Sequence, residues 1–342
     1  MANILILGAG SMGTAFSFPC SDNGHSLSII GTHLENDFID KINSTRKHPA
    51  LDCEVKENVK FFKFEQLKEE INKKIDLIVI AVVSKGIEWA SNEISKVLKN
   101  NIPILILTKG LSINNNNLEV LAHKMERLLK KNGMKEVNIS AAGGPCLAKN
   151  LANKAHTAVV FANIDIKIAE RISKLVSTDY YHVSTSDDVV GVEACAAIKN
   201  IFSMAVGAAQ GLCDANQSKE KNYLNTAAAL IQESIYEMIS FVGKLKGKKE
   251  TVIGLAGIGD LYVSADGGRN SKMGEYLGQG MTFQEAKKTK MPNITVEGAD
   301  LALEIGAKIK NDFDSKTLPL MISMIDTICE EKPLKINWKN FK

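Results

Sequence analysis

A long apolar stretch from Val189 to Cys213 constrains the fold of this chain more than any other part of the sequence. Small and aliphatic residues occupy every side of its helical wheel, which is typical of a helix that is buried on all sides. We therefore expect this helix to form the centre of a domain. Apart from cysteines, the ionisable side chains within it are Glu193 and Lys199.

Lys199, in the middle of this stretch, needs an explanation. Burying an ammonium group costs several kcal/mol unless a partner or a ligand compensates for the lost water. An ion pair with Glu193, or a side chain that extends to the surface, would explain the lysine without any function. Helical neighbours are three or four positions apart, however, so Glu193 and Lys199 lie on roughly opposite faces. We therefore favour a functional lysine.

Length and composition indicate a protein of two globular domains. A chain of 342 residues is longer than one hydrophobic core usually supports. Its 45% hydrophobic and 24% charged residues lie in the range of soluble globular proteins. The net charge is only +3, and no run of lysine or arginine is interleaved with aromatic residues. These features argue against a nucleic acid as the partner.

Cysteine usage and the N-terminal sequence predict a cytoplasmic location. The six cysteines show no CxxC spacing, so neither a bound metal nor a disulfide framework is indicated. Such scattered cysteines are typical of a reducing compartment. The chain starts directly with an apolar strand, and no charge-free apolar run approaches the roughly 20 residues of a membrane span. The sequence leaves the oligomeric state open, with a homodimer as one option.

A glycine-rich turn near the N-terminus predicts a dinucleotide site. The apolar run from Asn3 to Leu7 is typical of a strand buried in a parallel sheet. It leads directly into the GxGxxG pattern of Gly8, Gly10 and Gly13, and a helical segment follows. Glycines at such a turn let the backbone approach a pyrophosphate, whose charge is stabilised at the helix N-terminus. The alternative is a purely structural turn, since glycine-rich turns are common.

The end of the second strand bears on the choice between NAD and NADP. An NAD-specific fold carries an Asp or Glu about 20 residues after the third glycine. Here the strand from Leu27 to Ile30 is followed by Gly31 and Thr32, and the first acid is Glu35. The sequence thus indicates no charge at the strand end that would repel a 2′-phosphate, and no arginine that would bind one. It leaves the cofactor, NAD or NADP, unresolved.

Strands and helices alternate up to residue 188. This alternation predicts right-handed crossovers and a mostly parallel sheet, as in Rossmann-type α/β domains. Ligands are then expected at the carboxyl ends of the strands. The predicted segments are strands at 76–83, 103–107, 137–140, 156–161 and 180–183, and helices at 85–98, 117–131 and 166–175.

Two loops that follow predicted strands are candidates for ligand binding. Lys109 comes directly after the strand that ends at Leu107, where it can reach an anionic ligand at the sheet edge. Gly144 belongs to a Gly-Gly-Pro turn that follows another strand. Either loop could equally be without function, as a solvated lysine or as a simple reversal of the chain.

Strand patterns give way to helices from residue 189 onward. We therefore expect a dinucleotide-binding Rossmann-type domain over residues 1–188 and an all-helical, substrate-binding domain over residues 189–342. The predicted helices after the apolar one cover 224–245, 272–280, 283–288, 298–310 and 319–330.

Two glycine-rich connections interrupt these helices. The first, from Gly254 to Leu261, contains Asp260, and the second contains Gly268, Arg269 and Asn270. So many glycines allow the backbone to pack closely around a ligand. The planar guanidinium group of an arginine suits a phosphate or a carboxylate. The alternative is the ordinary composition of a flexible loop.

Taken together, these segments resemble the NAD(P)-dependent glycerol-3-phosphate dehydrogenase family. The resemblance covers nearly the whole chain, and its motifs follow the family's order. They are GAGSMGTA at 8–15, TKGL at 108–111, GGPCLAKNLA at 143–152, VGVEACAAIKNIFSMAVG at 190–207, GLAGIGDL at 254–261, GGRN at 267–270 and VEG at 296–298. Each motif alone is weak evidence, whereas their occurrence in register is specific.

The resemblance implies reversible NAD(P)H-dependent reduction of dihydroxyacetone phosphate to sn-glycerol 3-phosphate, a glycerophospholipid precursor. Lys199 would be the proton donor, and Asp260 would orient its ammonium group. No metal is implied. The implied cofactor contacts are Gly8, Gly10, Ser11, Met12, Gly13, Thr32, Lys109, Ala148, Arg269 and Glu297. The implied substrate contacts are Lys109, Gly144, Lys199, Asp260, Gly268, Arg269 and Asn270.

The sequence departs from the family pattern at several positions. Met12 stands where an aromatic residue is common, Cys146 where many members have Ser or Thr, and Gln232 where a basic residue is common. The segment 214–222 is longer and more charged than usual. Two alternatives therefore stay open. One is a related two-domain dehydrogenase that acts on another phosphorylated or carboxylated ketone, and the other is a catalytically inactive dinucleotide-sensing protein.

Overall fold

Two compact units make up the chain in the computed structural model, which describes residues 1–51, 53–98, 101–214 and 223–341. The first unit comprises Met1–Lys109 and Val120–Val189, and the second comprises Gly110–Glu119 and Val190–Lys342. The chain thus passes from the first unit to the second for the last time after Val189, next to the boundary expected at residue 188. The second unit also takes in a segment from the N-terminal half of the chain.

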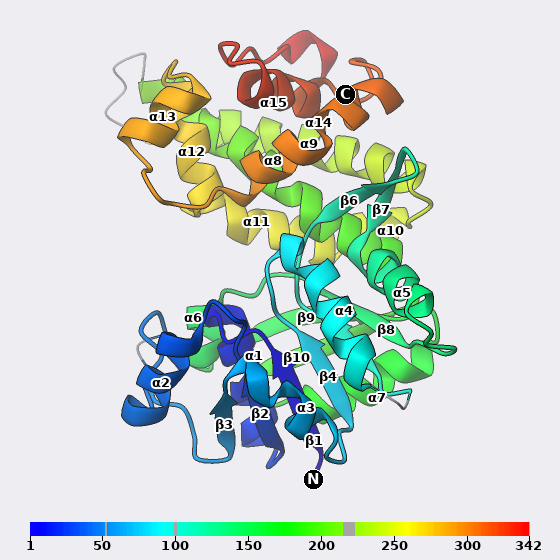
Figure 1. Cartoon of the computed structure of the whole chain (residues 1–342). Coiled ribbons are helices and arrows are strands. Elements are labelled where there is room, and N and C mark those ends of the chain that lie inside the picture. The colour runs from blue at the N-terminus through cyan, green and yellow to red at the C-terminus, as the bar shows by residue number, and fades with distance from the viewer. Residues whose placement is uncertain (52, 99–100, 215–222, 342) are drawn as a thin grey trace. The chain divides into compact units, whose positions relative to one another are not determined.

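An eight-stranded sheet forms the centre of the first unit (Figure 1). The strand order is β10-β9-β8-β5-β4-β1-β2-β3, and the neighbours pair in parallel except for β8 and β9. This mostly parallel sheet confirms the predicted Rossmann-type fold. The strands are β1 (Asn3–Leu7), β2 (Ser26–Ile30), β3 (Val59–Phe62), β4 (Leu77–Ile80), β5 (Ile104–Ile106), β8 (Ile139–Gly143), β9 (Thr157–Ala162) and β10 (Tyr181–Ser186).

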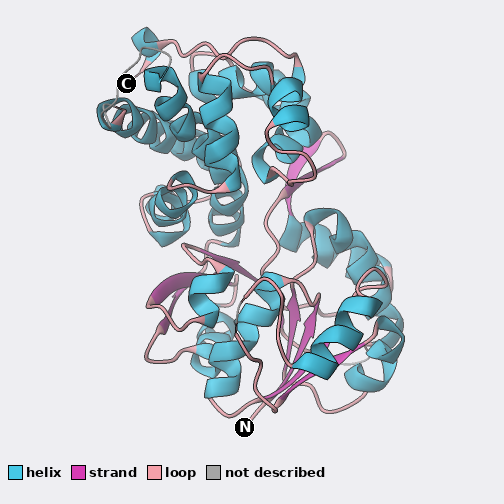
Figure 2. Ribbon diagram, turned by 90° about the vertical axis from the view of Figure 1, so that its left-hand side faces the viewer, coloured by secondary structure: helices cyan, strands magenta, loops and turns pink. Residues whose placement is uncertain are grey.

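Helices flank the strands of this sheet on both sides (Figure 2). The central strands are therefore apolar on both faces, and Leu5, Ile6 and Leu7 of β1 have no exposed surface. The helices are α1 (Ser11–Asp22), α2 (Asn36–Thr45), α3 (Leu67–Ile71), α4 (Ile87–Val97), α5 (Leu121–Lys131), α6 (Ala148–Ala152) and α7 (Ile166–Val176), with short 3₁₀ turns η1 (Phe64–Gln66) and η2 (Ser84–Gly86).

Helices also form most of the second unit, around α8 (Val189–Asp214). Cys195, Ile198 and Ile201 of this helix are fully buried, as its uniformly apolar sequence predicts. The other helical segments are α9 (Leu224–Lys244), α10 (Lys249–Val252), the π-helical turn η3 (Leu255–Gly259), α11 (Asp260–Ala265), α12 (Arg269–Gly278), α13 (Phe283–Thr289), α14 (Glu297–Asp312), α15 (Pro319–Cys329) and the 3₁₀ turn η4 (Trp338–Asn340).

α8 is long and apolar enough to cross a membrane by length and composition alone, and within the described residues it is the one such helix. However, 89% of its most apolar window is buried inside the protein. The central helix of a globular domain has the same composition, so this helix is weak evidence for a membrane span.

Four glycines bring α8 and α12 into close backbone contact. A Cβ atom on Gly274 of α12 would lie 1.8 Å from the carbonyl oxygen of Met204 in α8. A Cβ atom on Gly211 of α8 would lie 1.9 Å from the carbonyl oxygen of Glu275 in α12. Cβ atoms on Gly207 and Gly278 would likewise lie too close to the backbone of the other helix. Because side chains do not fit between these backbones, two helices that carry candidate site residues are fixed against each other.

The structure corrects the start of the helix predicted at 117–131. β6 (Leu111–Asn114) and β7 (Asn117–Val120) form a two-stranded sheet, and α5 begins at Leu121. Asn115 and Asn116 have φ values of 47° and 60°, which a two-residue hairpin turn requires and asparagine tolerates. Part of this hairpin, 110–119, accompanies the helices of the second unit.

Candidate active site

The turn between β1 and α1 can be formed only with glycine. Gly8 adopts a φ of 113°, and a Cβ atom there would lie 2.6 Å from the carbonyl oxygen of Ala81. A Cβ atom on Gly13 would lie 2.2 Å from the carbonyl oxygen of Gly8. The absence of side chains at both positions lets the backbone pass tightly from the strand into the helix.

The N-terminus of α1 fits a pyrophosphate group. Gly10 is the N-cap residue, and among the described residues no side chain caps this end and no acid lies in the first turn. The backbone amides at a helix N-terminus carry partial positive charge, so they favour a bound anion. Ser11 and Met12 are the first two residues of the helix and are half-buried.

The carboxyl end of β2 differs from its prediction. The sequence indicates no charge at this end, but the structure brings the Glu35 carboxylate back to it. Glu35 Oε2 accepts hydrogen bonds from the Thr32 amide at 2.7 Å and from the Ala9 amide at 3.4 Å. A tight turn, in which the Glu35 amide donates to the Thr32 carbonyl at 3.0 Å, makes this approach possible. A carboxylate therefore lies between the strand end and the glycine-rich turn.

Lys109, Gly144 and Ala148 lie in loops at the same edge of the sheet. β8 pairs in parallel with β5, β5 with β4, and β4 with β1, so the carboxyl ends of these four strands share the edge of the glycine-rich turn. Lys109 follows β5 and is half-buried. Gly144 follows β8 with a φ of 120°, and Ala148 is the first residue of α6. The structure thus brings these sequence-predicted residues to the expected edge.

Lys199 and Asp260 form a buried ion pair in the second unit. Their side chains are 7% and 2% exposed, respectively. Lys199 Nζ donates hydrogen bonds to Asp260 Oδ1 and to Ser264 Oγ, the latter at 2.7 Å. Asp260 and Ser264 are one helical turn apart on α11, so one face of that helix meets the ammonium group. The buried lysine therefore has Asp260, rather than a position at the surface, to compensate for its lost hydration.

Most of the connection 254–261 is helical, so the alternative of a flexible loop is wrong for it. It contains the π-helical turn η3 and the start of α11. A Cβ atom on Gly257 would lie 1.9 Å from the carbonyl oxygen of Val252, so the glycine lets the wide turn pack against the preceding helix. π-Helical turns occur frequently at functional sites. Here the turn delivers Asp260 to Lys199.

Asn270 joins three helices of the second unit. Its side-chain amide donates to Asn200 Oδ1 at 3.1 Å, and its Oδ1 accepts from the Gly298 amide at 2.8 Å. Asn200 directly follows Lys199 in α8, and Gly298 lies at the start of α14. The structure therefore brings Asn270 to the residue that follows the lysine in α8.

Arg269 lies at a more exposed position beside Asn270. It forms an ion pair with Glu297, and the two side chains are 58% and 39% exposed. Gly268, which precedes Arg269, is the N-cap residue of α12, and within the described residues no side chain caps this end. The guanidinium group and the helix N-terminus therefore present positive charge side by side.

Sequence reasoning missed Ser264 and Asn200 as members of this group. Ser264 lies four positions after Asp260, so a helical reading of this segment could have found it. Asn200 adjoins the buried lysine in sequence, but its contact with Asn270 joins residues 70 positions apart. No periodic pattern predicts such a contact.

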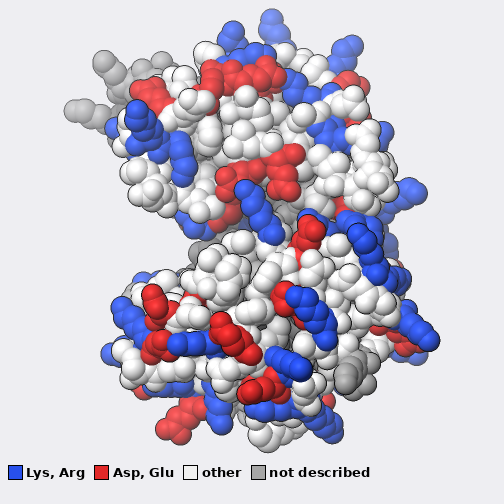
Figure 3. All heavy atoms as spheres, viewed as in Figure 1, with Lys and Arg blue, Asp and Glu red and all other residues white. Residues whose placement is uncertain are grey.

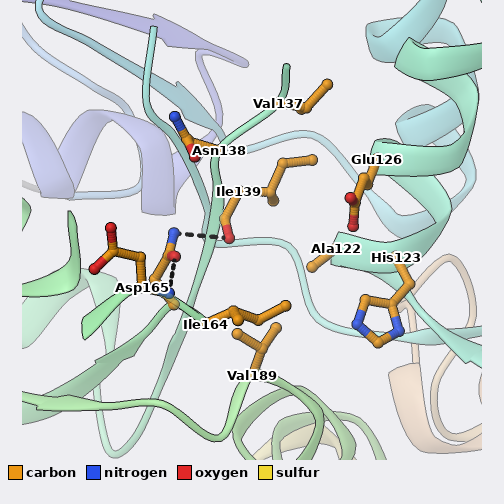
Figure 4. A pocket seen from close by; sticks show the side chains of 10 residues that line it. Ala122, His123, Glu126, Val137, Asn138, Ile139, Ile164, Asp165 and Val189 are labelled. Carbon is orange, nitrogen blue, oxygen red and sulfur yellow. Dashed lines mark hydrogen bonds between the residues drawn. The ribbon is translucent and has the colours of Figure 1, made fainter. Parts of the chain in front are cut away.

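A separate pocket in the first unit does not coincide with the predicted site (Figure 4). It lies where β8 begins and β9 ends, which is the amino edge of the parallel strands and thus opposite the glycine-rich turn. Asn163 Nδ2 donates to the Ile139 carbonyl at 3.0 Å beside it. The lining residues include His123, Glu126 and Asp165.

Charged side chains on the face shown in Figure 3 are not sorted by sign. Lysine and arginine are interspersed with aspartate and glutamate over this face, in keeping with a net charge of +3 for the chain. An extended basic surface of the kind that binds a nucleic-acid backbone does not occur on this face.

Family models match both parts of the chain. The model of the NAD-dependent glycerol-3-phosphate dehydrogenase N-terminus matches residues 3–169, and that of its C-terminus matches residues 188–338. An NADP(+)-dependent glycerol-3-phosphate dehydrogenase from Archaeoglobus fulgidus is 31% identical over 314 residues, covering 90% of this chain and 91% of the relative. A glycerol-3-phosphate dehydrogenase (NAD(P)+) from Agathobacter rectalis is 30% identical over 348 residues, covering 98% and 94%.

Solved structures agree with these matches. The crystal structure of glycerol-3-phosphate dehydrogenase from Coxiella burnetii has a TM-score of 0.80 at 26% identity, covering 97% of this chain and 96% of that one. D-mandelate dehydrogenase in complex with NADH has a TM-score of 0.56 at 14% identity, a likeness of fold alone. The family models, the relatives and the fold all agree, and the chain belongs to the NAD-dependent glycerol-3-phosphate dehydrogenase family.

Proposed function

We propose that this chain catalyses the reversible, NAD(P)H-dependent reduction of dihydroxyacetone phosphate to sn-glycerol 3-phosphate. The observation that carries the proposal is the buried contact of Lys199 with Asp260 and Ser264. An ammonium group held in this way is suited to a carbonyl oxygen that gains negative charge during reduction. The names of the relatives support the same reaction class.

Lys199 is the proposed proton donor. A dinucleotide held at the glycine-rich turn would supply the hydride for the ketone carbon, and the electron pair of the carbonyl bond would move to the oxygen. Lys199 stabilises this oxygen and transfers a proton to it. Asp260 favours the charged form of the lysine and orients it, while Ser264 holds a second N–H group. In the reverse direction the neutral amine accepts the proton of the substrate hydroxyl.

The start of α12 is the proposed site of the substrate phosphate. Gly268, Arg269 and Asn270 combine a helix N-terminus, a guanidinium fork and a side-chain amide. An arginine binds phosphate oxygens through two parallel hydrogen bonds, which a lysine cannot do. The ion pair of Arg269 with Glu297 is largely exposed, so exchange of the carboxylate for a ligand costs little. Lys109 and Gly144 are the further proposed substrate contacts.

The dinucleotide is the proposed ligand of the glycine-rich turn. Support comes from the close approaches of Gly8 and Gly13 and from the uncapped N-terminus of α1. Gly10, Ser11 and Met12 would hold the pyrophosphate with backbone amides. The other proposed cofactor contacts are Thr32, Lys109, Ala148, Arg269 and Glu297.

The proposal extends to domain roles and cellular context. Residues 1–188 would bind the dinucleotide and residues 189–342 the substrate. The product is a precursor of glycerophospholipids, so the chain would supply phospholipid biosynthesis in the cytoplasm, as a homodimer. The scattered cysteines support a reducing compartment.

One assay with a panel of ketones tests the proposed reaction. Purified protein is given NADH or NADPH together with dihydroxyacetone phosphate, 2-keto acids or keto sugars, and loss of nicotinamide absorbance is followed. We expect dihydroxyacetone phosphate to have the highest kcat/KM. Preference for another ketone would assign a related dehydrogenase, and this outcome would direct attention to Cys146 and Gln232. Dinucleotide binding without turnover of any ketone would assign a sensing protein. The charged segment 215–222 lies outside the described residues.

A further inference from the structure

We propose that Glu35 selects the unphosphorylated adenosine ribose, so that this chain binds NADH in preference to NADPH. The inference rests on the proposed function and adds the choice of cofactor to it. It starts from the position of Glu35 Oε2, which accepts from the amides of Thr32 and Ala9 at 2.7 and 3.4 Å. One carboxylate oxygen thus joins the end of β2 to the glycine-rich turn.

This position is where the adenosine ribose of a dinucleotide lies in a Rossmann-type fold. β1 and β2 are parallel neighbours, and the Gly8 amide donates to the Ile30 carbonyl at 2.8 Å, so their carboxyl ends are joined. In NAD-specific folds an acid at the end of the second strand accepts hydrogen bonds from the ribose hydroxyls. Glu35 brings its carboxylate to the same strand end from the N-cap position of α2. The turn replaces the acid that the strand itself lacks.

His48 supplies a second, independent observation at this place. Its residue surface is 4% exposed, and its Nε2 has no hydrogen-bond partner among the described residues. Nδ1 accepts from the Ala50 amide at 3.1 Å, so the ring proton is assigned to Nε2. Desolvation lowers the pKa of His48, and the Ala9 backbone and the Glu35 carboxylate oppose this effect. His48 thus places a buried ring N–H beside Glu35 and the Ala9 backbone.

A polar acceptor without a partner lies next to Glu35 in the sequence. Asn36 Oδ1 is shielded from solvent and accepts no hydrogen bond from the described residues. Buried polar groups are normally paired, because each unpaired group loses hydration without compensation. Asn36 Oδ1 is thus suited to accept a hydrogen bond from a ligand hydroxyl group.

Two cationic side chains of this region, Arg46 and Lys63, are engaged elsewhere. Arg46 donates to the carbonyl oxygens of Val55 and Val59, each at 3.0 Å. Lys63 forms an ion pair with Asp40 at 2.7 Å. A 2′-phosphate would therefore be repelled by the Glu35 carboxylate, and neither Arg46 nor Lys63 would offset this repulsion. To bind there, the phosphate would have to displace the carboxylate from the amides of Thr32 and Ala9. We expect the dissociation constant for NADPH to exceed that for NADH by about tenfold or more.

Direct binding measurements with two variants test the inference. The dissociation constants of NADH and NADPH are measured from nicotinamide fluorescence with the full chain, without substrate. Glu35→Gln removes the charge at nearly constant shape and should reduce the NADPH-to-NADH ratio of dissociation constants by about tenfold. Asp37→Asn removes an exposed charge from the same helix and should leave the ratio unchanged. Thr32→Arg keeps Glu35, adds the missing cation and should lower the NADPH dissociation constant by at least about fivefold.

The outcomes separate this inference from the proposed reaction. Equal affinity of the parent chain for NADH and NADPH would overturn the inference. An equal loss of both affinities in Glu35→Gln, together with a lower melting temperature, would also overturn it, because Glu35 would then act as a structural cap. If Glu35→Gln does not fold, an unchanged NADPH affinity in Thr32→Arg overturns the inference. Either result leaves the reduction of dihydroxyacetone phosphate intact. Failure to bind either dinucleotide would overturn the proposed function itself.

Discussion

Lys199 of α8 and Asp260 of α11 are joined by an ion pair although both side chains are almost completely buried. Such a pair contributes little to stability, because the loss of hydration offsets most of the electrostatic attraction. Ser264 accepts a further hydrogen bond from the same ammonium group at 2.7 Å. A buried ammonium group with these two partners supports the proposed role of Lys199 as proton donor.

Removal of Lys199 and Asp260 together should separate catalysis from folding. Lys199→Met alone strands the Asp260 carboxylate and should lower the free energy of unfolding by about 3–5 kcal/mol. Lys199→Met combined with Asp260→Asn removes both charges, so most of that stability should return, while kcat remains at least about a hundredfold below the parent value. Urea titrations and turnover of the same preparations check this, and turnover near the parent value in the double variant would make the pair purely structural.

Arg269→Lys should reduce activity without reducing stability. The substitution keeps the charge but loses the two parallel hydrogen bonds to a phosphate, so kcat/KM for dihydroxyacetone phosphate should decrease by about tenfold or more. The ion pair with Glu297 is exposed, so the free energy of unfolding should change by less than about 1 kcal/mol. Lys272→Ala, which breaks the pair between an exposed lysine and the half-buried Glu275 on the same helix, is the matched control. Parent-like kinetics of Arg269→Lys would remove Arg269 from the proposed phosphate site.

Much of the fold follows from patterns within single segments. The helix predicted from Val189 to Cys213 is observed from Val189 to Asp214, because a segment that is apolar all round has no exposed face that could alter its structure. β1 and the glycine-rich turn are likewise predictable, since the strand, the turn and the helix are consecutive in the chain. Lys199 could be singled out because one charge in an apolar helix requires a partner or a function.

Contacts between distant segments could not be predicted in this way. Glu35 comes after a strand end without an acid, and only the turn at Thr32 brings its carboxylate back to that end. The hairpin at Asn115 depends on positive φ values, which a run of asparagines permits but does not impose. The glycines of α8 and α12 carry no sign of which backbone they approach, because an absent side chain leaves no periodic pattern.

The close contact of α8 and α12 predicts opposite effects for two glycine substitutions. The Cβ atom of Gly274→Ala would lie 1.8 Å from the Met204 carbonyl oxygen, so the helices must separate, and the free energy of unfolding should decrease by about 2 kcal/mol or more. Gly243→Ala lies within α9, where the new Cβ meets no described atom within 4 Å outside the adjoining helix backbone, and it should stabilise the protein by about 0.5–1 kcal/mol. Thermal unfolding of both variants checks the prediction, and equal effects would contradict it.

Asp22 at the end of α1 should make the stability of the first unit dependent on pH in the acid range. Burial acts to raise the pKa of this carboxyl group, but hydrogen bonds from Lys56, Tyr180 and Lys154 outweigh it and lower the pKa to about 2. An unfolded aspartate has a pKa of about 3.9, so the native state gains stability from the ionised form above that pH. This gain is lost as the pH falls from about 4 to about 2.

Asp22→Asn should therefore lower the free energy of unfolding by about 1 kcal/mol at pH 7, where solvent screens the two exposed lysine partners. The same substitution should lower it by much less near pH 2. Urea titrations at both pH values measure the difference, and Asp179→Asn, an acid beside Tyr180 in sequence, is the control. A penalty that does not change between pH 7 and pH 2 would show that Asp22 acts through its shape and not through its charge.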